Sequence, residues 1–108
     1  MENLELKLID EIMTEDKEIK YYQNQYYEIR LRKYLHTGYK SVNISRSSGY
    51  YIPAIEVIED NDNYDIVGFE IQTTGYGALS TEQIEEVIKG YEIAIATVKQ
   101  LEKMFLNK

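Results

Sequence analysis

The C-terminal quarter of the chain constrains the fold most, because its apolar residues recur with the period of a long helix. Ser80 and Gln83 have the spacing of a capping box, and Leu79 and Ile84 stand where a hydrophobic staple would. Beyond this start, apolar side chains recur every three or four positions, at Ile84, Val87, Ile88, Tyr91, Ala94, Ile95, Val98, Leu101 and Phe105. The pattern predicts one helix of about 25 residues, in spite of Gly90 in its middle.

The length of this helix has a consequence for its last turns. The helix would be roughly 38 Å long, whereas a strand of about six to eight residues spans only about 20 to 27 Å. We therefore expect the last turns to extend past a sheet. Their apolar residues would then be covered by an N-terminal helix or, in a homodimer, by the C-terminal helix of a second copy. These residues are Val98, Leu101, Met104 and Phe105.

The middle of the chain predicts four short strands joined by tight turns. Residues 26–35 alternate between apolar and polar side chains, and residues 41–45 do the same. Residues 50–59 form a third strand, in which Pro53 suggests an edge position or a bulge. Residues 64–73 form a fourth strand, whose expected inward side chains are Val67, Phe69 and Ile71. Four strands in succession predict an antiparallel meander.

Residues 3–13 fit two patterns. Five apolar residues share one helical face, namely Leu4, Leu8, Ile9, Ile12 and Met13, while Leu4, Leu6 and Leu8 alternate as in a strand. We interpret the segment as a short helix; a strand there would leave a whole face of the sheet open. The predicted fold is a single α+β domain over residues 1–108. It has two layers, with a short N-terminal helix, a four-stranded antiparallel meander and a long C-terminal helix packed on the sheet.

The charge distribution is uneven. The net charge of −7 argues against duplex DNA or an anionic membrane as a partner for the whole surface. One segment differs from this average, because residues 30–46 contain five basic residues and no acidic one. That segment carries +5, so the rest of the chain carries −7 − 5 = −12.

We find no signature of an enzyme, a cofactor site or a metal site. There is no cysteine, and His36 is the single histidine. The loop "GYGALS" at 75–80 departs from the dinucleotide pattern, because Ser80 stands at its third glycine and no strand follows the helix. The acidic stretch 59–65 does not match a calcium-binding loop. No apolar run approaches the ~20 residues of a membrane span, so we expect a soluble protein in the cytoplasm.

Two binding hypotheses follow from the charge distribution. In the first, an acidic surface occupies a basic groove on a host protein. Its residues are Glu56, Glu59, Asp60, Asp62, Asp65, Glu82, Glu85 and Glu86. In the second, a basic and aromatic sheet face binds single-stranded nucleic acid. Its residues are Arg30, Arg32, Tyr34, Tyr39, Lys40 and Arg46. The alternative to this second hypothesis is that the arginines are neutralised by Glu28, Glu56 and Glu70.

Two resemblances bear on these hypotheses. With a meander that enters a long helix through "GALSTEQIEEVI", residues 26–105 resemble PC4-like and Whirly-like single-strand-binding proteins. That resemblance implies a helix that packs on the sheet and mediates dimers. The stretch "TTGYGALSTEQIEEVIKGYEIA" and the acidic, tyrosine-, lysine- and isoleucine-rich composition look like small proteins of phages and mobile elements in low-GC Gram-positive bacteria. This second resemblance implies a non-enzymatic protein that binds and inhibits a host protein, as anti-CRISPR proteins do.

Overall fold

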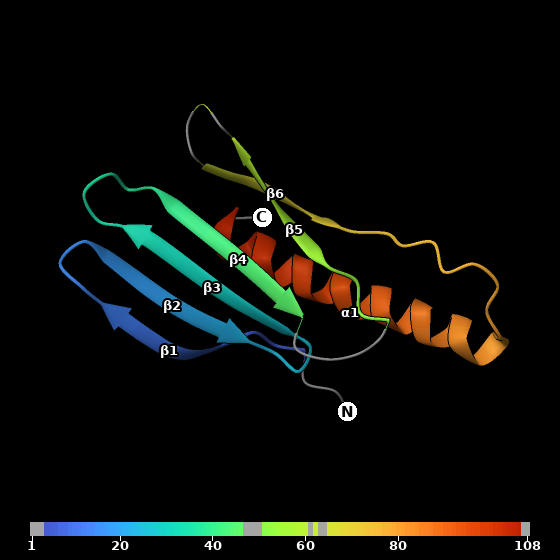
Figure 1. Cartoon of the computed structure of the whole chain (residues 1–108). Coiled ribbons are helices and arrows are strands. Elements are labelled where there is room, and N and C mark those ends of the chain that lie inside the picture. Colours follow the sequence, from blue (N-terminus) through green and yellow to red (C-terminus); the bar gives the residue numbers. More distant parts are fainter. Residues whose placement is uncertain (1–3, 47–50, 61, 63–64, 107–108) are drawn as a thin grey trace.

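The computed structural model describes residues 4–46, 51–60, 62 and 65–106, and within them it shows six strands and one helix (Figure 1). The strands are β1 (Lys7–Met13), β2 (Lys17–Gln23), β3 (Tyr27–Tyr34), β4 (Lys40–Arg46), β5 (Ile55–Asp60) and β6 (Asp65–Ile71), and the helix is α1 (Thr81–Phe105). β1 to β4 form an antiparallel sheet in chain order, and β5 and β6 form a separate antiparallel pair. The predicted α+β class is confirmed.

The predicted N-terminal helix is wrong, because residues 7–23 form the hairpin β1–β2 instead. Residues 14–17, which follow the segment interpreted as a helix, make the hairpin turn. Thr14 donates its N–H to the carbonyl of Lys17, and its hydroxyl accepts the N–H of Lys17 at 3.1 Å. A threonine that bonds the nearby backbone in this way favours a turn over a helix. A short isolated helix is marginal in water, whereas β2 gives this segment a paired strand whose register shifts only between Leu8 and Asp10.

The four strands predicted in the middle of the chain exist, but they do not form one sheet. β3 and β4 join the N-terminal hairpin, while β5 pairs only with β6. Between them the chain passes through Pro53, which is buried and whose carbonyl accepts the hydroxyl of Tyr27. Because proline cannot donate to a ladder, β5 begins only after it. The tight turn predicted between the second and third of these strands lies partly outside the described residues.

The prediction for β6 is partly wrong. Phe69 is buried and Ile71 is half-buried, but the side chain of Val67 is 52% exposed. The pairing passes from Ile58 opposite Gly68 to Glu59 opposite Ile66, which leaves Val67 as the extra residue of a bulge. A bulge reverses the alternation of side chains along a strand, so the inward and outward positions change places at Val67.

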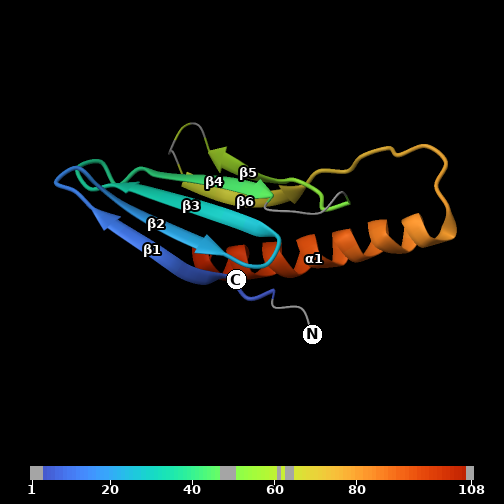
Figure 2. The same ribbon diagram turned by 60° about the horizontal axis from the view of Figure 1, so that its bottom comes forward.

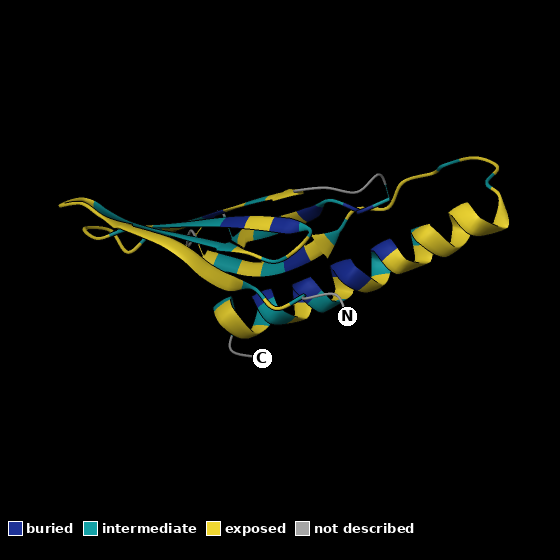
Figure 3. Cartoon of the chain, turned by 90° about the horizontal axis from the view of Figure 1, so that it is seen from below, coloured by how far each residue is buried: buried dark blue, intermediate teal, exposed yellow. Residues whose placement is uncertain are grey.

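The helix begins where the sequence predicted. The Ser80 hydroxyl accepts the N–H of Gln83, and the Gln83 side chain accepts the N–H of Ser80 at 2.9 Å, which completes the capping box. The part of the helix that packs on the sheets is its C-terminal half. The buried helix residues are Gly90, Ile93, Ala94, Thr97, Val98 and Leu101. The first turns project past the strands instead (Figures 2 and 3), so the prediction that the last turns overhang the sheet is wrong.

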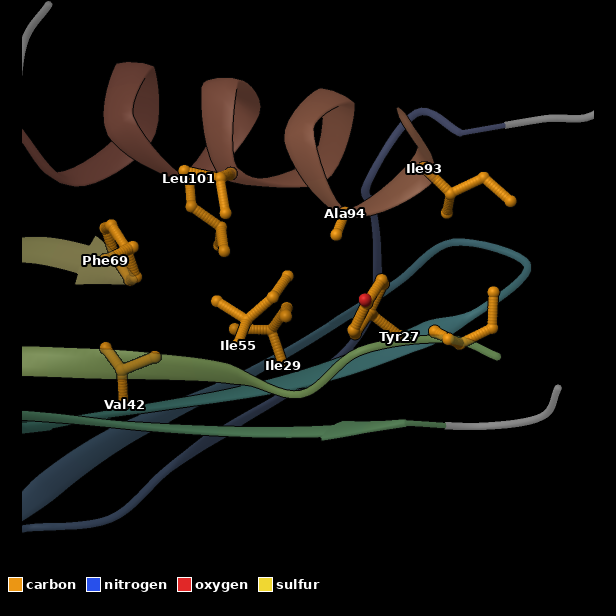
Figure 4. Packing of buried hydrophobic residues seen from close by; sticks show 10 residues of the cluster. Tyr27, Ile29, Val42, Ile55, Phe69, Ile93, Ala94 and Leu101 are labelled. Atoms are coloured by element: carbon orange, nitrogen blue, oxygen red, sulfur yellow. The ribbon is translucent and has the colours of Figure 1, made fainter. Parts of the chain in front are cut away.

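The core lies between α1 and the inner faces of both sheets (Figure 4). Tyr27, Ile29 and Val42 come from the four-stranded sheet, and Ile55 and Phe69 come from β5 and β6. Hydrogen bonds made by polar side chains lie at one side of this core. The Asn24 side-chain amide donates to the Leu4 carbonyl and to the buried Thr97 hydroxyl, and the Gln100 side chain accepts the N–H of Leu6. The N-terminal segment is therefore attached to the helix without being helical itself.

Gly90 marks the place where the chain after β4 crosses the helix. A Cβ atom at this position would overlap the carbonyl oxygen of Tyr51. Glycine costs a helix interior about 1 kcal/mol relative to alanine, and here it permits the close approach of another backbone segment. Gly90, which by its helix propensity counts against a continuous helix, is therefore required where the Tyr51 backbone packs against α1.

Candidate functional surfaces

The four-stranded sheet has an inner face on the core and an outer face against which no element of the described chain packs (Figure 2). We call the outer one the open face. Residues that lie directly opposite one another on neighbouring strands share a face. One row across the open face is therefore Asp10, Tyr21, Arg30 and Asn43, and the next row is Ile12, Ile19, Arg32 and Ser41. Glu28, Tyr34 and Ser45 lie on the same face by alternation along the strands.

The open face carries a basic and aromatic strip along β3. Arg30 and Arg32 are two residues apart and therefore about 7 Å apart along the strand. The Tyr34 ring stacks on the Tyr39 ring, with 5.8 Å between the ring centroids and 27° between the planes. The Arg32 guanidinium lies 3.5 Å from the Tyr34 hydroxyl. Beside Arg30, a shallow depression of about 520 Å³ is lined by Ile9, Tyr21, Tyr22, Glu28, Ile29, Arg30, Asn43 and Ser45.

Neither arginine of this strip forms an ion pair with a carboxylate of the described residues. The ion pairs among the described residues are Lys20–Glu11, Lys20–Glu18 and His36–Asp16, and none of them includes an arginine. Glu56 and Glu70, two of the three carboxylates of that alternative, lie on the other sheet. Glu28, the third, lies on the open face and lines the same depression as Arg30, but it is in none of these ion pairs. The Nε atom of Arg30 is buried and has no hydrogen-bond partner among the described residues. An unpaired buried donor is costly, and an acceptor brought by a ligand would satisfy it.

Four of the six residues predicted for nucleic-acid binding gather at the open face, and two do not. Arg30, Arg32 and Tyr34 are on it, and Tyr39 stacks at its end. Lys40 lies opposite Lys33 on the inner face, and Arg46 lies opposite Tyr27 and donates to the Ile52 carbonyl at 3.1 Å. Sequence reasoning missed Tyr21, because the hairpin β1–β2 was not predicted.

Tyr27 belongs to the core and not to a binding surface. Burial raises the pKa of its hydroxyl to about 12, although nearby Arg46 lowers it. On the inner face, the hydrogen bond from Lys20 to Glu18, 3.1 Å long, raises the pKa of the lysine above its ordinary value. Both groups keep their ordinary neutral-pH charge states, and neither has the lowered pKa expected of a lysine base or tyrosine nucleophile.

The predicted acidic surface is divided between two places. Glu56, Glu59, Asp60, Asp62 and Asp65 lie on the hairpin β5–β6 and its turn, whereas Glu82, Glu85 and Glu86 lie in the first turns of α1. Asp65 lies near Phe105 at the other end of the helix, where both line one depression. Because some 19 residues of helix separate Glu86 from Phe105, the two acidic groups are roughly 30 Å apart. We call them the acidic hairpin and the helix end.

The helix end is apolar as well as acidic. Ile84 and Ile88 are 44% and 53% exposed, and with Ile95 they form a stripe beside the glutamates. The residues predicted to form a dimer lie elsewhere. Val98 and Leu101 are buried in the core, and the Phe105 ring is 6.0 Å from that of Phe69, which leaves Met104 as the exposed one. A homodimer stays a prediction, but Val98 and Leu101 are not available for it.

Within the described residues, no group of three or more histidine or acidic side chains is arranged to hold a metal ion. No helix of the described chain is both long and apolar enough to cross a membrane. Comparisons with known proteins found no matching family model, no matching curated protein and no matching solved structure. Function is therefore argued from the chemistry of the surfaces.

Proposed function

We propose that the protein acts by binding rather than by catalysis, and that its open face binds single-stranded nucleic acid. The observation that carries this proposal is the pair of half-buried arginines on β3, which lie on the open face near the stacked tyrosines and form no ion pair with the described residues. Guanidinium groups bind phosphate oxygens through paired hydrogen bonds. Aromatic rings stack on unpaired bases of any sequence.

A single strand suits this face better than a duplex. The net charge of −7 opposes the broad phosphate surface of duplex DNA. The strip is narrow, with Arg30 and Arg32 in one line and Tyr21 and Tyr34 near its two ends. Asn43, Ser41 and Ser45 line its side with hydrogen-bonding groups for base edges or a ribose hydroxyl. About four nucleotides would fill a strip of this length.

The test is fluorescence anisotropy with a labelled oligothymidine of about ten nucleotides. We expect the double variant Arg30→Gln, Arg32→Gln to weaken binding roughly tenfold or more, because each arginine contacts a phosphate. The matched control is Lys33→Gln, Lys40→Gln, which makes the same change in charge on the inner face and should preserve most of the affinity. Tyr34→Ala should weaken binding roughly fivefold to 150-fold through lost stacking.

Salt dependence makes the test sharper. Each phosphate contact to a single strand adds about −0.7 to the slope of log K against log salt. The wild type should therefore show a slope of about −1.4 or steeper, and the double arginine variant a slope near zero. Absent binding, or an equal loss in the lysine control, would show that the open face is not a nucleic-acid site.

A second candidate function is supported by the acidic hairpin. Five acidic residues gather on β5, β6 and their turn, and the pair forms a sheet of its own. Such a surface complements a basic nucleic-acid groove on a host protein. The resemblance of residues 73–94 to phage and mobile-element proteins supports binding and inhibition of a host protein, as anti-CRISPR proteins do, in the host cytoplasm.

This candidate is tested by capture from a nuclease-treated host lysate with two triple variants. One is Asp60→Lys, Asp62→Lys, Asp65→Lys on the acidic hairpin, and the other is Glu82→Lys, Glu85→Lys, Glu86→Lys at the helix end. The two make the same change in charge at places roughly 30 Å apart. A partner lost only with the hairpin variant supports the candidate, whereas a partner retained by that variant removes it.

A further inference from the structure

The helix and the four-stranded sheet overlap only in part, and each extends past the other at an opposite end of the molecule (Figures 2 and 3). At one end the first turns of α1 project beyond the strands. At the other end the turns that join β1 to β2 and β3 to β4 lie beyond the C-terminal end of α1. The inner face of the sheet is therefore left without a covering helix at that end. We call this uncovered region the shelf.

The shelf is basic with an apolar floor. A groove of about 350 Å³ is lined there by Glu18, Lys20, Tyr22, Leu31, Lys33, Lys40, Met104 and Phe105. Lys20 is paired with Glu18 at 3.1 Å. Lys33 and Lys40 lie directly opposite each other on β3 and β4, and no ion pair includes either of them among the described residues. Like charges directly opposite on neighbouring strands destabilise a sheet, so an anionic partner would relieve this pair.

The helix end has the complementary chemistry. Ile84 and Ile88 are exposed apolar side chains on one side of the first turns of α1, Glu85 lies next to them around the helix, and the exposed Glu82 and Glu86 lie on the other sides. Isoleucines match the Leu31, Met104 and Phe105 floor of the shelf, and the glutamates match Lys33 and Lys40. Burying exposed isoleucines in such a contact removes apolar surface from water, which favours association.

The directions of the helices also agree. If the helix end of one molecule enters the shelf of another, its N-terminus meets the C-terminal end of the first α1. The partial positive charge of a helix N-terminus then lies near the partial negative charge of a helix C-terminus, which is a favourable arrangement. The two helices would be nearly collinear. The projecting first turns of one α1 would cover the shelf of the other copy.

We infer that the helix end of one copy docks on the shelf of the next, so that the protein associates head to tail. The two contacting surfaces differ, so each copy keeps one free helix end and one free shelf. Such a contact adds further copies until a ring closes, or it gives an open filament. This association uses neither the open face nor a nucleic acid. Its test is therefore independent of the test of the proposed function.

The test is sedimentation velocity over a range of protein concentrations. The wild type should form a series of species that grows with concentration and shortens at high salt, because charge pairs contribute to the contact. The helix-end variant, Glu82→Lys, Glu85→Lys, and the shelf variant, Lys33→Glu, Lys40→Glu, should each weaken association roughly tenfold or more. The matched control is Glu56→Lys, Glu59→Lys on the hairpin, which should associate like the wild type.

A mixture of the two variants decides between this contact and a symmetric one. Lysines at the helix end of the first variant face glutamates on the shelf of the second, and the converse contact is also complementary. The mixture should therefore associate although neither variant does alone. If the shelf variant still associates by itself, the contact is a symmetric one between helix ends, and the head-to-tail arrangement is wrong.

Engineered cysteines give a second measurement that does not depend on charge reversal. The chain has no cysteine of its own. A protein with both Ile88→Cys and Lys33→Cys should give a ladder of disulfide-linked multimers on mild oxidation, whereas a mixture of the two single variants should stop at the linked dimer. A wild type that stays monomeric at every concentration, together with an absent ladder, would overturn the inference.

Discussion

The two halves of α1 share one apolar periodicity but have opposite surroundings. Ile93 and Ala94 in the C-terminal half are buried, whereas Glu86 and Val87, seven residues earlier on the same side of the helix, are exposed and half-buried. In Figure 3 the buried positions occupy the half that lies along the strands, and the projecting turns are mostly exposed. An apolar stripe in the sequence therefore indicates which side of a helix can be buried. The position of the sheet determines which part of the helix is buried along its length.

The largest expected effect tests this difference with one substitution made in both halves. Ile93→Ala should lower the free energy of unfolding by about 2 to 5 kcal/mol, because it leaves a cavity between the helix and both sheets. Ile88→Ala should change it by less than about 0.5 kcal/mol, as measured by denaturant unfolding at a protein concentration low enough to keep the chain monomeric. Equal losses at the two positions would mean that the side of the projecting half that carries Ile88 is also packed.

The second prediction concerns the boundary between the halves. Gly90→Ala should destabilise the protein by about 1 to 3 kcal/mol, because the new methyl group overlaps the Tyr51 carbonyl. This loss would run against the gain of about 1 kcal/mol that alanine brings to a helix interior. The control is Gly75→Ala, where a Cβ meets nothing within 4 Å. A stabilised Gly90→Ala protein would place the Tyr51 backbone farther from the helix.

The third prediction concerns the hydrogen bonds that stabilise the first turns of α1. The capping box at Ser80 is the local device at its start. Ser80→Ala should cost about 1 kcal/mol, because one amide loses its acceptor. Hydrogen exchange should show faster opening of the amides in the first turns of α1, with little change beyond Gly90. Ser45→Ala on β4 serves as the control, and uniform opening of the whole helix would contradict the prediction.

The fourth prediction concerns Tyr27, beneath the packed half, where an effect as small as that of Ser80→Ala is expected at neutral pH. Tyr27→Phe should cost about 1 kcal/mol through the lost hydrogen bond to Pro53. The pKa of Tyr27 is raised from 10.0 to about 12 in the folded protein. Its contribution to stability is therefore complete below pH 10 and is lost as the pH rises toward 12.

The measurement for Tyr27 is the free energy of unfolding at several pH values from neutral to about 12. The wild type should lose more stability than Tyr27→Phe over the alkaline part of this range. Parallel curves for the two proteins would mean that the Tyr27 hydroxyl is not desolvated in the folded state.

The N-terminal and C-terminal parts of the chain also differ in net charge. From Lys7 to Arg46 there are eight basic and six acidic residues, a net +2, whereas residues 55–105 contain three basic and eleven acidic residues, a net −8. The structure gives each part its own sheet. The positive part is compatible with an anionic ligand on the open face. Opposite charges on the two parts also favour contacts between copies of the chain.

Much of the local structure could be predicted from the sequence. The capping box, the helix bounds and the presence of β3 to β6 depend on interactions between residues close in the chain. The hairpin β1–β2 could not be predicted with the same success, because its apolar residues fit a helix and a strand equally. Four of six residues of the candidate nucleic-acid site follow from alternation along β3 and the turn after it. Tyr21 depends on the hairpin, and Lys40 and Arg46 depend on the register of β4.

By itself, the sequence determined the long capped helix, the strand segments in the middle of the chain and the contrast in charge between the two parts. These properties arise from spacing, side-chain type and nearby hydrogen bonds, which the order of residues contains directly. Only the tertiary structure decided that the strands divide into two sheets, that the helix is buried in its C-terminal half, and that the acidic residues lie in two places. Each of those outcomes depends on packing between segments far apart in the chain, such as Tyr51 against Gly90 or Phe69 against Phe105.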